Sequence, residues 1–140
     1  MSSSHVFVES RVVTEEDLDD LNHVNNLQYL RWTLKTANAH SKHVGWSSDR
    51  YHQLGAGWLV RSHKITYKMP AVLGDEVLIR TWIEELDRVS ALRKYEVMRK
   101  ADDRVYAVAE TRWVFVDLKS LKLLAIPNDV RMAFQFPLNE

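Results

Sequence analysis

The stretch "LDDLNHVNNLQYLRW", Leu18 to Trp32, decides the fold because it marks where a loop becomes a helix. An acidic pair, a histidine and two asparagines come directly before an apolar and aromatic run. An asparagine is a favoured N-cap, since its side-chain oxygen accepts a hydrogen bond from a free amide of the first turn. From there, apolar residues recur at helical spacing: Leu27, Leu30, Leu34 and Ala37, with Tyr29 and Trp32 widening the apolar face. The stretch therefore predicts a helix that begins at Asn25 or Asn26, runs to about Lys42 and ends near Gly45.

Extended segments are expected on both sides of this helix. Their residues are β-branched or alternate with polar ones, and turn residues separate them. The expected strands are His5 to Val13, Trp58 to Met69 after a turn in "HQLGAG", a run through Val77, Ile79 and Thr81, Leu92 to Arg99, and about Val105 to Asp117. The tail, Asn128 to Phe136, is expected to start a short helix that Pro137 limits.

One long helix and four or five strands cannot form a doubly wound parallel fold, which needs alternating helices and strands. The helix carries aromatic residues on more than one side, as an element enclosed by a curved sheet requires. The chain of 140 residues has the length of one domain and contains no repeat or linker that would divide it. The sequence thus predicts an α+β protein, with residues 1–140 as one domain in which an antiparallel sheet wraps a single helix.

Composition excludes several classes of function. The formal net charge is zero and the basic residues are scattered, so neither nucleic acid nor a membrane surface is an expected partner. The absence of cysteine excludes disulfides, a thiol nucleophile and thiolate metal ligands. The start of the chain does not resemble a secretory signal and no window has transmembrane length, so we expect a cytoplasmic protein.

The polar residues before the helix, Asp17, Asp19, Asp20 and His23, admit three interpretations. They could form a solvated acidic loop that favours the helix N-terminus through its dipole. They could bind a metal, although no HExxH motif or repeated oxygen-ligand loop accompanies them. They could also serve acyl transfer, in which a carboxylate works beside helix N-terminal amides that stabilise an oxyanion. No GxSxG motif is present, which disfavours a serine nucleophile.

The pattern Asp19-xxx-"HVNN"-xx-Tyr29-xx-Trp32 resembles the hotdog-fold acyl-thioesterases of the 4-hydroxybenzoyl-CoA thioesterase type. Within that superfamily it is similar to the HVNN branch, which includes bacterial long-chain acyl-CoA thioesterases and plant acyl-ACP thioesterases. The segments "YKMPAVLGDEV", from Tyr67, and "DRVSALRKYEV", from Asp87, resemble two further family motifs. The likeness runs in order from about Val6 to Pro127.

The resemblance implies a hotdog fold, a homodimer or homotetramer with active sites between subunits, and no metal or other cofactor. It implies hydrolysis of an acyl thioester to a free carboxylic acid and coenzyme A, with an acyl carrier protein as an alternative carrier. Asp19 takes the place of the catalytic aspartate, as nucleophile or general base. Amides around Val24 to Asn26 would stabilise the tetrahedral intermediate. His23 and Asn25 are candidate catalytic residues, with hydrogen bonding or helix capping as alternatives.

Other residues are candidates for substrate contact. Val24, Asn26, Tyr29 and Trp32 are assigned to the acyl thioester, although the two aromatic residues also suit core packing. Coenzyme A phosphates are assigned to Arg88, Ser90 and Arg93, because guanidinium groups pair well with phosphate. The alternative is that these three are solvated surface residues. In plant acyl-ACP enzymes an additional asparagine stands two residues before the histidine, where this chain has Leu21. An acyl-CoA-binding protein without turnover is a further alternative, whereas the Asp-x-Asn-Pro-xx-His pattern of hotdog hydratases is absent.

Overall fold

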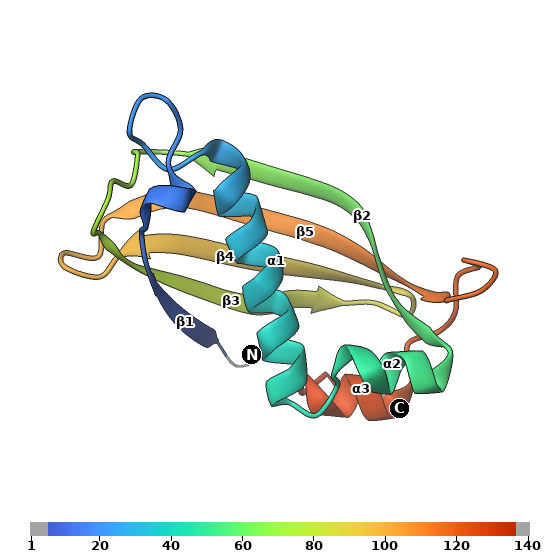
Figure 1. Cartoon of the computed structure of the whole chain (residues 1–140). Coiled ribbons are helices and arrows are strands. Elements are labelled where there is room, and N and C mark those ends of the chain that lie inside the picture. Colours follow the sequence, from blue (N-terminus) through green and yellow to red (C-terminus); the bar gives the residue numbers. More distant parts are fainter. Residues whose placement is uncertain (1–5, 137–140) are drawn as a thin grey trace.

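The computed structural model describes residues 6–136 and contains a five-stranded antiparallel sheet (Figure 1). The strands follow one another across the sheet in the order β1-β3-β4-β5-β2, so β1 and β2 form its two edges. Their bounds are β1 Phe7–Val12, β2 Ala56–Tyr67, β3 Glu76–Leu86, β4 Ser90–Arg99 and β5 Val105–Asp117. The predicted strands are confirmed to within a few residues, except that His5 lies outside the described residues.

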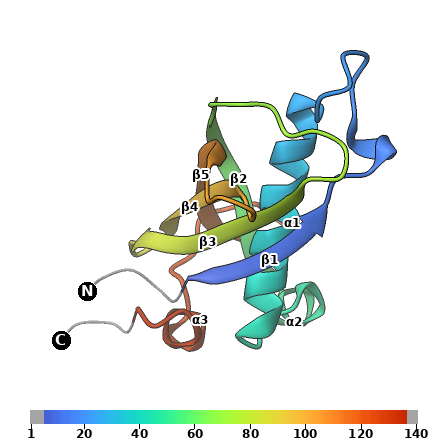
Figure 2. The ribbon, with the colours of Figure 1, turned by 90° about the vertical axis from the view of Figure 1, so that its left-hand side faces the viewer.

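A single long helix, α1 (Asn26–His43), crosses one face of the curved sheet (Figures 1 and 2). Its buried residues recur every three or four positions and so form the face that packs on the sheet: Tyr29, Trp32, Thr33, Thr36, Ala37 and His40. Val44 caps the C-terminus, and Gly45 follows with a φ of 98°. Both the helix and the α+β class predicted from the sequence are confirmed.

Three short helical segments complete the fold. A 3₁₀ turn (Glu15–Asp17) precedes α1, and α3 (Asn128–Ala133) confirms the helix expected in the tail. Helix α2 (Ser48–Leu54) begins ahead of the turn predicted in "HQLGAG" and was not expected. It buries a single residue, Tyr51, so its sequence carries no amphipathic period. Its ends are fixed by local chemistry instead, since the Ser47 side chain accepts a hydrogen bond from the amide of Arg50 and Gly55 adopts a φ of 80°.

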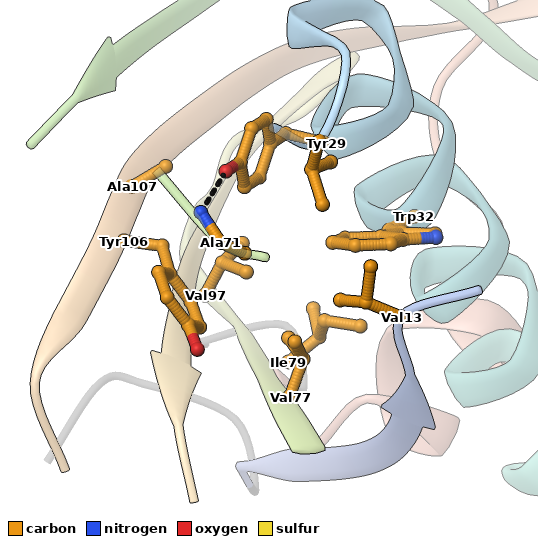
Figure 3. Close-up of a cluster of buried hydrophobic side chains, with 10 residues drawn as sticks. Val13, Tyr29, Trp32, Ala71, Val77, Ile79, Val97, Tyr106 and Ala107 are labelled. Carbon is orange, nitrogen blue, oxygen red and sulfur yellow. Dashed lines mark hydrogen bonds between the residues drawn. The ribbon is translucent and has the colours of Figure 1, made fainter. Parts of the chain in front are cut away.

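The interior between helix and sheet divides into two groups of buried side chains. The first lies below the N-terminal half of α1 and includes Tyr29, Trp32 and Tyr106 (Figure 3). The hydroxyl of Tyr29 accepts a hydrogen bond of 2.9 Å from the buried amide of Ala71. The second lies toward the C-terminal end of α1, where α2 and α3 meet the sheet (Figures 1 and 2), and includes Trp46 and Phe134.

Strand β2 is an edge strand with an unusually long unpaired side. It spans 12 residues and pairs only with β5 in the described structure. The ladder is interrupted by a register shift between Val60 and Ser62, and most residues from Arg61 to Tyr67 are exposed. An unpaired edge of this length offers a row of backbone donors and acceptors to another strand.

Candidate active site

Asp17 organises the loop that leads into α1. One of its carboxylate oxygens accepts hydrogen bonds from the amide of Thr14 at 2.8 Å and from the Thr14 hydroxyl at 3.3 Å. The other accepts from the side-chain amide of Gln28 at 2.6 Å, and the main-chain carbonyl of Asp17 accepts from the amide of Asn25. Asp17 is also buried. Its carboxylate is therefore committed to holding the loop against the first turn of α1.

Asp19 sits in the same loop but keeps one oxygen available. Its Oδ1 atom accepts hydrogen bonds from the amides of Leu21 at 2.9 Å and His23 at 3.2 Å, and its own amide donates to the carbonyl of His23 at 2.7 Å. Asn22 closes this tight loop with a φ of 63°, a conformation that asparagine tolerates. Within residues 6–136, Oδ2 of Asp19 makes no hydrogen bond. The loop thus fixes the carboxylate while leaving an oxygen for chemistry.

An open depression of about 360 Å³ lies beside Asp19. Five of the predicted site residues line it: Asp19, His23, Val24, Asn26 and Tyr29. The remaining lining comes from the end of β2 and the segment after it, Tyr67 to Pro70. Residues from two distant parts of the chain therefore meet at the start of α1.

One amide at the start of α1 belongs to a residue that lines the depression and has no acceptor among the described residues. The amide of Val24 donates to the carbonyl of Ala71, that of Asn25 donates to Asp17, and that of Leu27 donates to the side-chain oxygen of Asn25. Across the described part of the chain, the amide of Asn26 has no hydrogen-bond acceptor. It stands at the positive end of the helix dipole, and the first turn contains no acidic residue to occupy it. Of the amides from Val24 to Asn26 that were expected to bind an oxyanion, that of Asn26 is the one without an acceptor among the described residues.

Asn25 has a different position from the one expected of a catalytic group. Its side-chain oxygen accepts the amide hydrogen of Leu27 at 2.9 Å, which makes Asn25 the N-cap of α1. It does not line the depression. The sequence left two roles open for Asn25, catalysis and helix capping, and in the structure its side chain caps the helix. The side chain of His23 is exposed at the edge of the depression.

Tyr67 is a site residue that the sequence did not identify. Its hydroxyl donates a hydrogen bond of 3.0 Å to the carbonyl of Asn26, and its ring packs edge-on against Tyr29 with centroids 5.5 Å apart. Burial raises the pKa of both phenols, so each hydroxyl keeps its proton at neutral pH. The signal for Tyr67 was its place at the start of the motif "YKMPAVLGDEV".

The other predicted contact residues lie away from the depression. Trp32 is 2% exposed and belongs to the first core group. Ser90 begins β4 and donates to Asp87 in the β3–β4 turn, at the other end of β3 from the Asp19 loop, and the neighbouring Arg88 is exposed. Arg93 is only 5% exposed, because β4 turns it toward α1. Arg93 therefore lies inside the protein, apart from the exposed Arg88, and the assignment of Arg88, Ser90 and Arg93 to coenzyme A phosphates stays a prediction.

The described structure contains neither a cluster of metal ligands nor a membrane-spanning helix. Among residues 6–136, no three acidic or histidine side chains are grouped as metal ligands. The helices within the same range lack the combination of length and apolar character that a membrane crossing requires.

Comparison with known proteins shows the family to which this chain is related. The model of the thioesterase-like superfamily matches residues 13–134. The chain is 30% identical over 117 residues to the long-chain acyl-CoA thioesterase FadM of Escherichia coli, covering 81% of this chain and 86% of that protein. It is 29% identical over 99 residues to a chloroplastic oleoyl-acyl carrier protein thioesterase of Coriandrum sativum, covering 66% of this chain but only 27% of that protein.

Solved structures show the same fold. A 1,4-dihydroxy-2-naphthoyl-CoA thioesterase from Synechocystis superimposes with a TM-score of 0.87 at 20% identity, covering 94% of this chain and 96% of the other. The agreement extends over nearly the full length of both chains. The hotdog fold that the motifs implied is thereby confirmed.

Proposed function

The chain belongs to the thioesterase-like superfamily and is a thioester hydrolase, and we propose that it cleaves acyl-CoA to a free carboxylic acid and coenzyme A at the depression beside Asp19. One observation carries this proposal. The unbonded carboxylate oxygen of Asp19 and the unbonded amide of Asn26 belong to residues that line the same depression.

These two groups match the two needs of thioester hydrolysis. The thioester carbonyl accepts a hydrogen bond from the amide of Asn26, which stabilises the negative oxygen of the tetrahedral intermediate. Asp19 either attacks the carbonyl carbon directly or removes a proton from the attacking water. In both routes the carbon–sulfur bond breaks and the sulfur takes up a proton as coenzyme A leaves. Direct attack leaves the acyl group on Asp19 as a mixed anhydride, which water then hydrolyses to the acid and free Asp19; in the general-base route water attacks the thioester itself. Tyr67 fixes the carbonyl of Asn26 and so positions the turn that carries the amide.

A pair of subunits is expected to complete the site. We infer that two copies join their β2 edges in antiparallel fashion, because that edge is long, exposed and unpaired. A two-fold axis near the middle of β2 sets the beginning of one strand beside the end of the other. The end of β2 adjoins Asn26 through Tyr67, and the beginning adjoins α2. Each Asp19 site would then face the α2 end of the partner.

Thiol release from acyl-CoA tests the activity. Wild-type protein should release free coenzyme A from a series of short, long and aromatic acyl-CoAs, and Asp19→Asn should lose at least ~100-fold in kcat, the usual scale for removing an acid–base group. The asparagine keeps an acceptor for the amides of Leu21 and His23, so the variant should remain folded. Asp20→Asn, an exposed neighbour outside the depression, is the matched control and should keep wild-type turnover.

The outcomes separate four cases. Loss of turnover in Asp19→Asn alone supports the proposed mechanism. Equal turnover in both variants assigns the chemistry to another residue. If the wild type binds acyl-CoA without releasing thiol, the protein is a non-catalytic binder. If it releases thiol only from acyl carrier protein thioesters, the substrate carrier is acyl carrier protein and not coenzyme A.

Sedimentation equilibrium tests the assembly. A dimer should have twice the 16.4 kDa mass of one chain. Substituting proline for exposed Lys64 of β2 should shift the mass toward one chain and reduce turnover together, whereas the control Lys64→Ala, which keeps the backbone amide, should change neither. A wild-type protein that sediments as a monomer with full turnover would contradict the shared site.

A further inference from the structure

A second cavity, of about 390 Å³, lies at the other end of the molecule from Asp19. It is bordered by the last turns of α1, by α2 and by the sheet, and its walls are mainly apolar and aromatic, including Trp46, Tyr51, Trp58 and Phe134. Its volume falls in the range typical of small-molecule sites, roughly 300–1,000 Å³.

One charged side chain is buried in the wall of this cavity. Arg93 lines it, and its Nη1 atom donates to Nδ1 of His40 at 2.9 Å and to the hydroxyl of Thr81 at 3.1 Å. Arginine can only donate, so Nδ1 of His40 is the acceptor in this contact. Burial lowers the pKa of Arg93, but an arginine guanidinium in a protein stays charged.

The described residues give Arg93 no counter-ion, although its guanidinium lies over the Phe134 ring, 5.8 Å from the centroid. No carboxylate within residues 6–136 lies at ion-pair distance from it, and its Nε and Nη2 atoms make no hydrogen bond with those residues. A buried charge without a counter-ion is unfavourable, so such groups are normally paired or fully hydrogen-bonded.

A second buried arginine shows how the same fold satisfies a structural guanidinium. Arg131 uses all three of its nitrogens, which donate to the carbonyls of Phe136, Asp87 and Leu86. It does not line the cavity. The contrast indicates that Arg93, which uses only Nη1 to hold His40 and Thr81, has donors left for a molecule in the cavity.

We propose that this cavity receives the far end of the acyl group and that Arg93 binds a carboxylate there, so that the preferred substrates are acyl-CoAs whose acyl group ends in a second carboxylate. This inference rests on the proposed function. The apolar walls suit the chain of such a group, and a fork of unused guanidinium donors suits its terminal carboxylate. Pairing of two β2 edges brings the cavity toward the partner's Asp19 site, because Gly57 and Trp58 at the beginning of β2 line the cavity while Tyr67 at its end lines the site.

The test compares matched pairs of substrates at several chain lengths. In each pair, one acyl-CoA ends in a methyl group and the other ends in a carboxylate. For the best length, wild-type protein should show a kcat/KM about 10- to 100-fold higher for the carboxylate-ended substrate, the usual effect of one hydrogen bond to a charged group. Equal or better use of the methyl-ended substrate at every length would overturn the proposal.

Variants assign the preference to Arg93. Arg93→Met, of similar length and without charge, should reverse the preference, whereas Arg93→Lys should retain part of it. The matched control is Arg50→Met, since Arg50 lies outside the cavity wall at the same end of the molecule, with its guanidinium 3.8 Å from the Trp46 ring. A substrate ratio that stays at the wild-type value in folded Arg93→Met would overturn the assignment. The wild-type comparison decides the question if that variant does not fold.

A binding measurement separates this inference from the proposed function. Asp19→Asn protein is titrated calorimetrically with the same substrate pairs, so that affinity is read without turnover. Tighter binding of the carboxylate-ended member supports the cavity assignment even if the wild type releases no thiol. If the wild type releases thiol from methyl-ended substrates and the variant binds both members of a pair equally, the proposed thioesterase function stands and the role of Arg93 is overturned.

Discussion

The hydroxyl of Tyr67 donates a hydrogen bond of 3.0 Å to the carbonyl of Asn26 and thereby joins the end of β2 to the start of α1 across 41 residues of chain. Tyr67→Phe removes this bond and keeps the ring that packs on Tyr29. We expect a fall of about 1 kcal/mol in the free energy of unfolding, typical of one hydrogen bond, and a lower kcat because the Asn26 amide is held less firmly. Urea unfolding and thiol release check the two effects; unchanged kcat would deny Tyr67 a positioning role.

Asn25 allows capping to be separated from chemistry. Serine is as good an N-cap as asparagine, whereas alanine costs about 1 kcal/mol. Asn25→Ser should therefore retain stability and turnover, and Asn25→Ala should lose stability. Thermal unfolding and thiol release distinguish the roles: a stable Asn25→Ser protein with greatly reduced turnover would restore Asn25 to the catalytic group.

Tyr29→Phe should destabilise the protein more than Tyr67→Phe does. The Tyr29 hydroxyl accepts a hydrogen bond from the amide of Ala71, which is fully buried. Removing the acceptor leaves that amide unsatisfied, at a cost of about 1–3 kcal/mol. Urea unfolding of the two variants side by side provides the comparison, and an equal or smaller loss for Tyr29→Phe would contradict it.

The β4–β5 turn has a predictable pH response. Two hydrogen bonds from the Arg99 guanidinium, at 2.8 and 3.0 Å, lower the pKa of Asp102 from 3.8 to about 2. Because the pKa is lowered in the folded state, this contact contributes stability above the unfolded pKa and loses it as pH falls through the interval from 3.8 to about 2. NMR titration of the Asp102 carboxyl measures the shift. The value should return toward 3.8 in Arg99→Gln; an unaltered value would assign the shift to another cause.

The parts of this protein that sequence predicts are those governed by neighbouring residues. The helical period after Asn26 and the alternation of β5 are local patterns, and both elements appear where they were expected. The loop position of Asp19 follows from its motif. Helix α2 was missed because it buries one residue and is defined by its caps.

Long-range contacts explain the remaining differences. The bond between Tyr67 and Asn26 depends on the return path of the chain, which no local pattern encodes. Arg93 was assigned to coenzyme A phosphates, with a solvated surface position as the alternative, because of its charge, although strand alternation places it on the same face as the buried Tyr95 and Val97. In that case the period of the strand was a better guide than the residue type.

The break in the β2 ladder between Val60 and Ser62 has a consequence for how the chain avoids aggregation. A flat, regular strand edge accepts any extended polypeptide and can nucleate fibrils. The irregularity in β2 twists its edge, and the exposed cations Arg61 and Lys64 repel a growing stack of identical strands. The same edge can therefore pair with one strand of matching twist without forming an open-ended stack of strands. Straightening β2 or neutralising its cations should accordingly lower the solubility of the protein before it alters the fold.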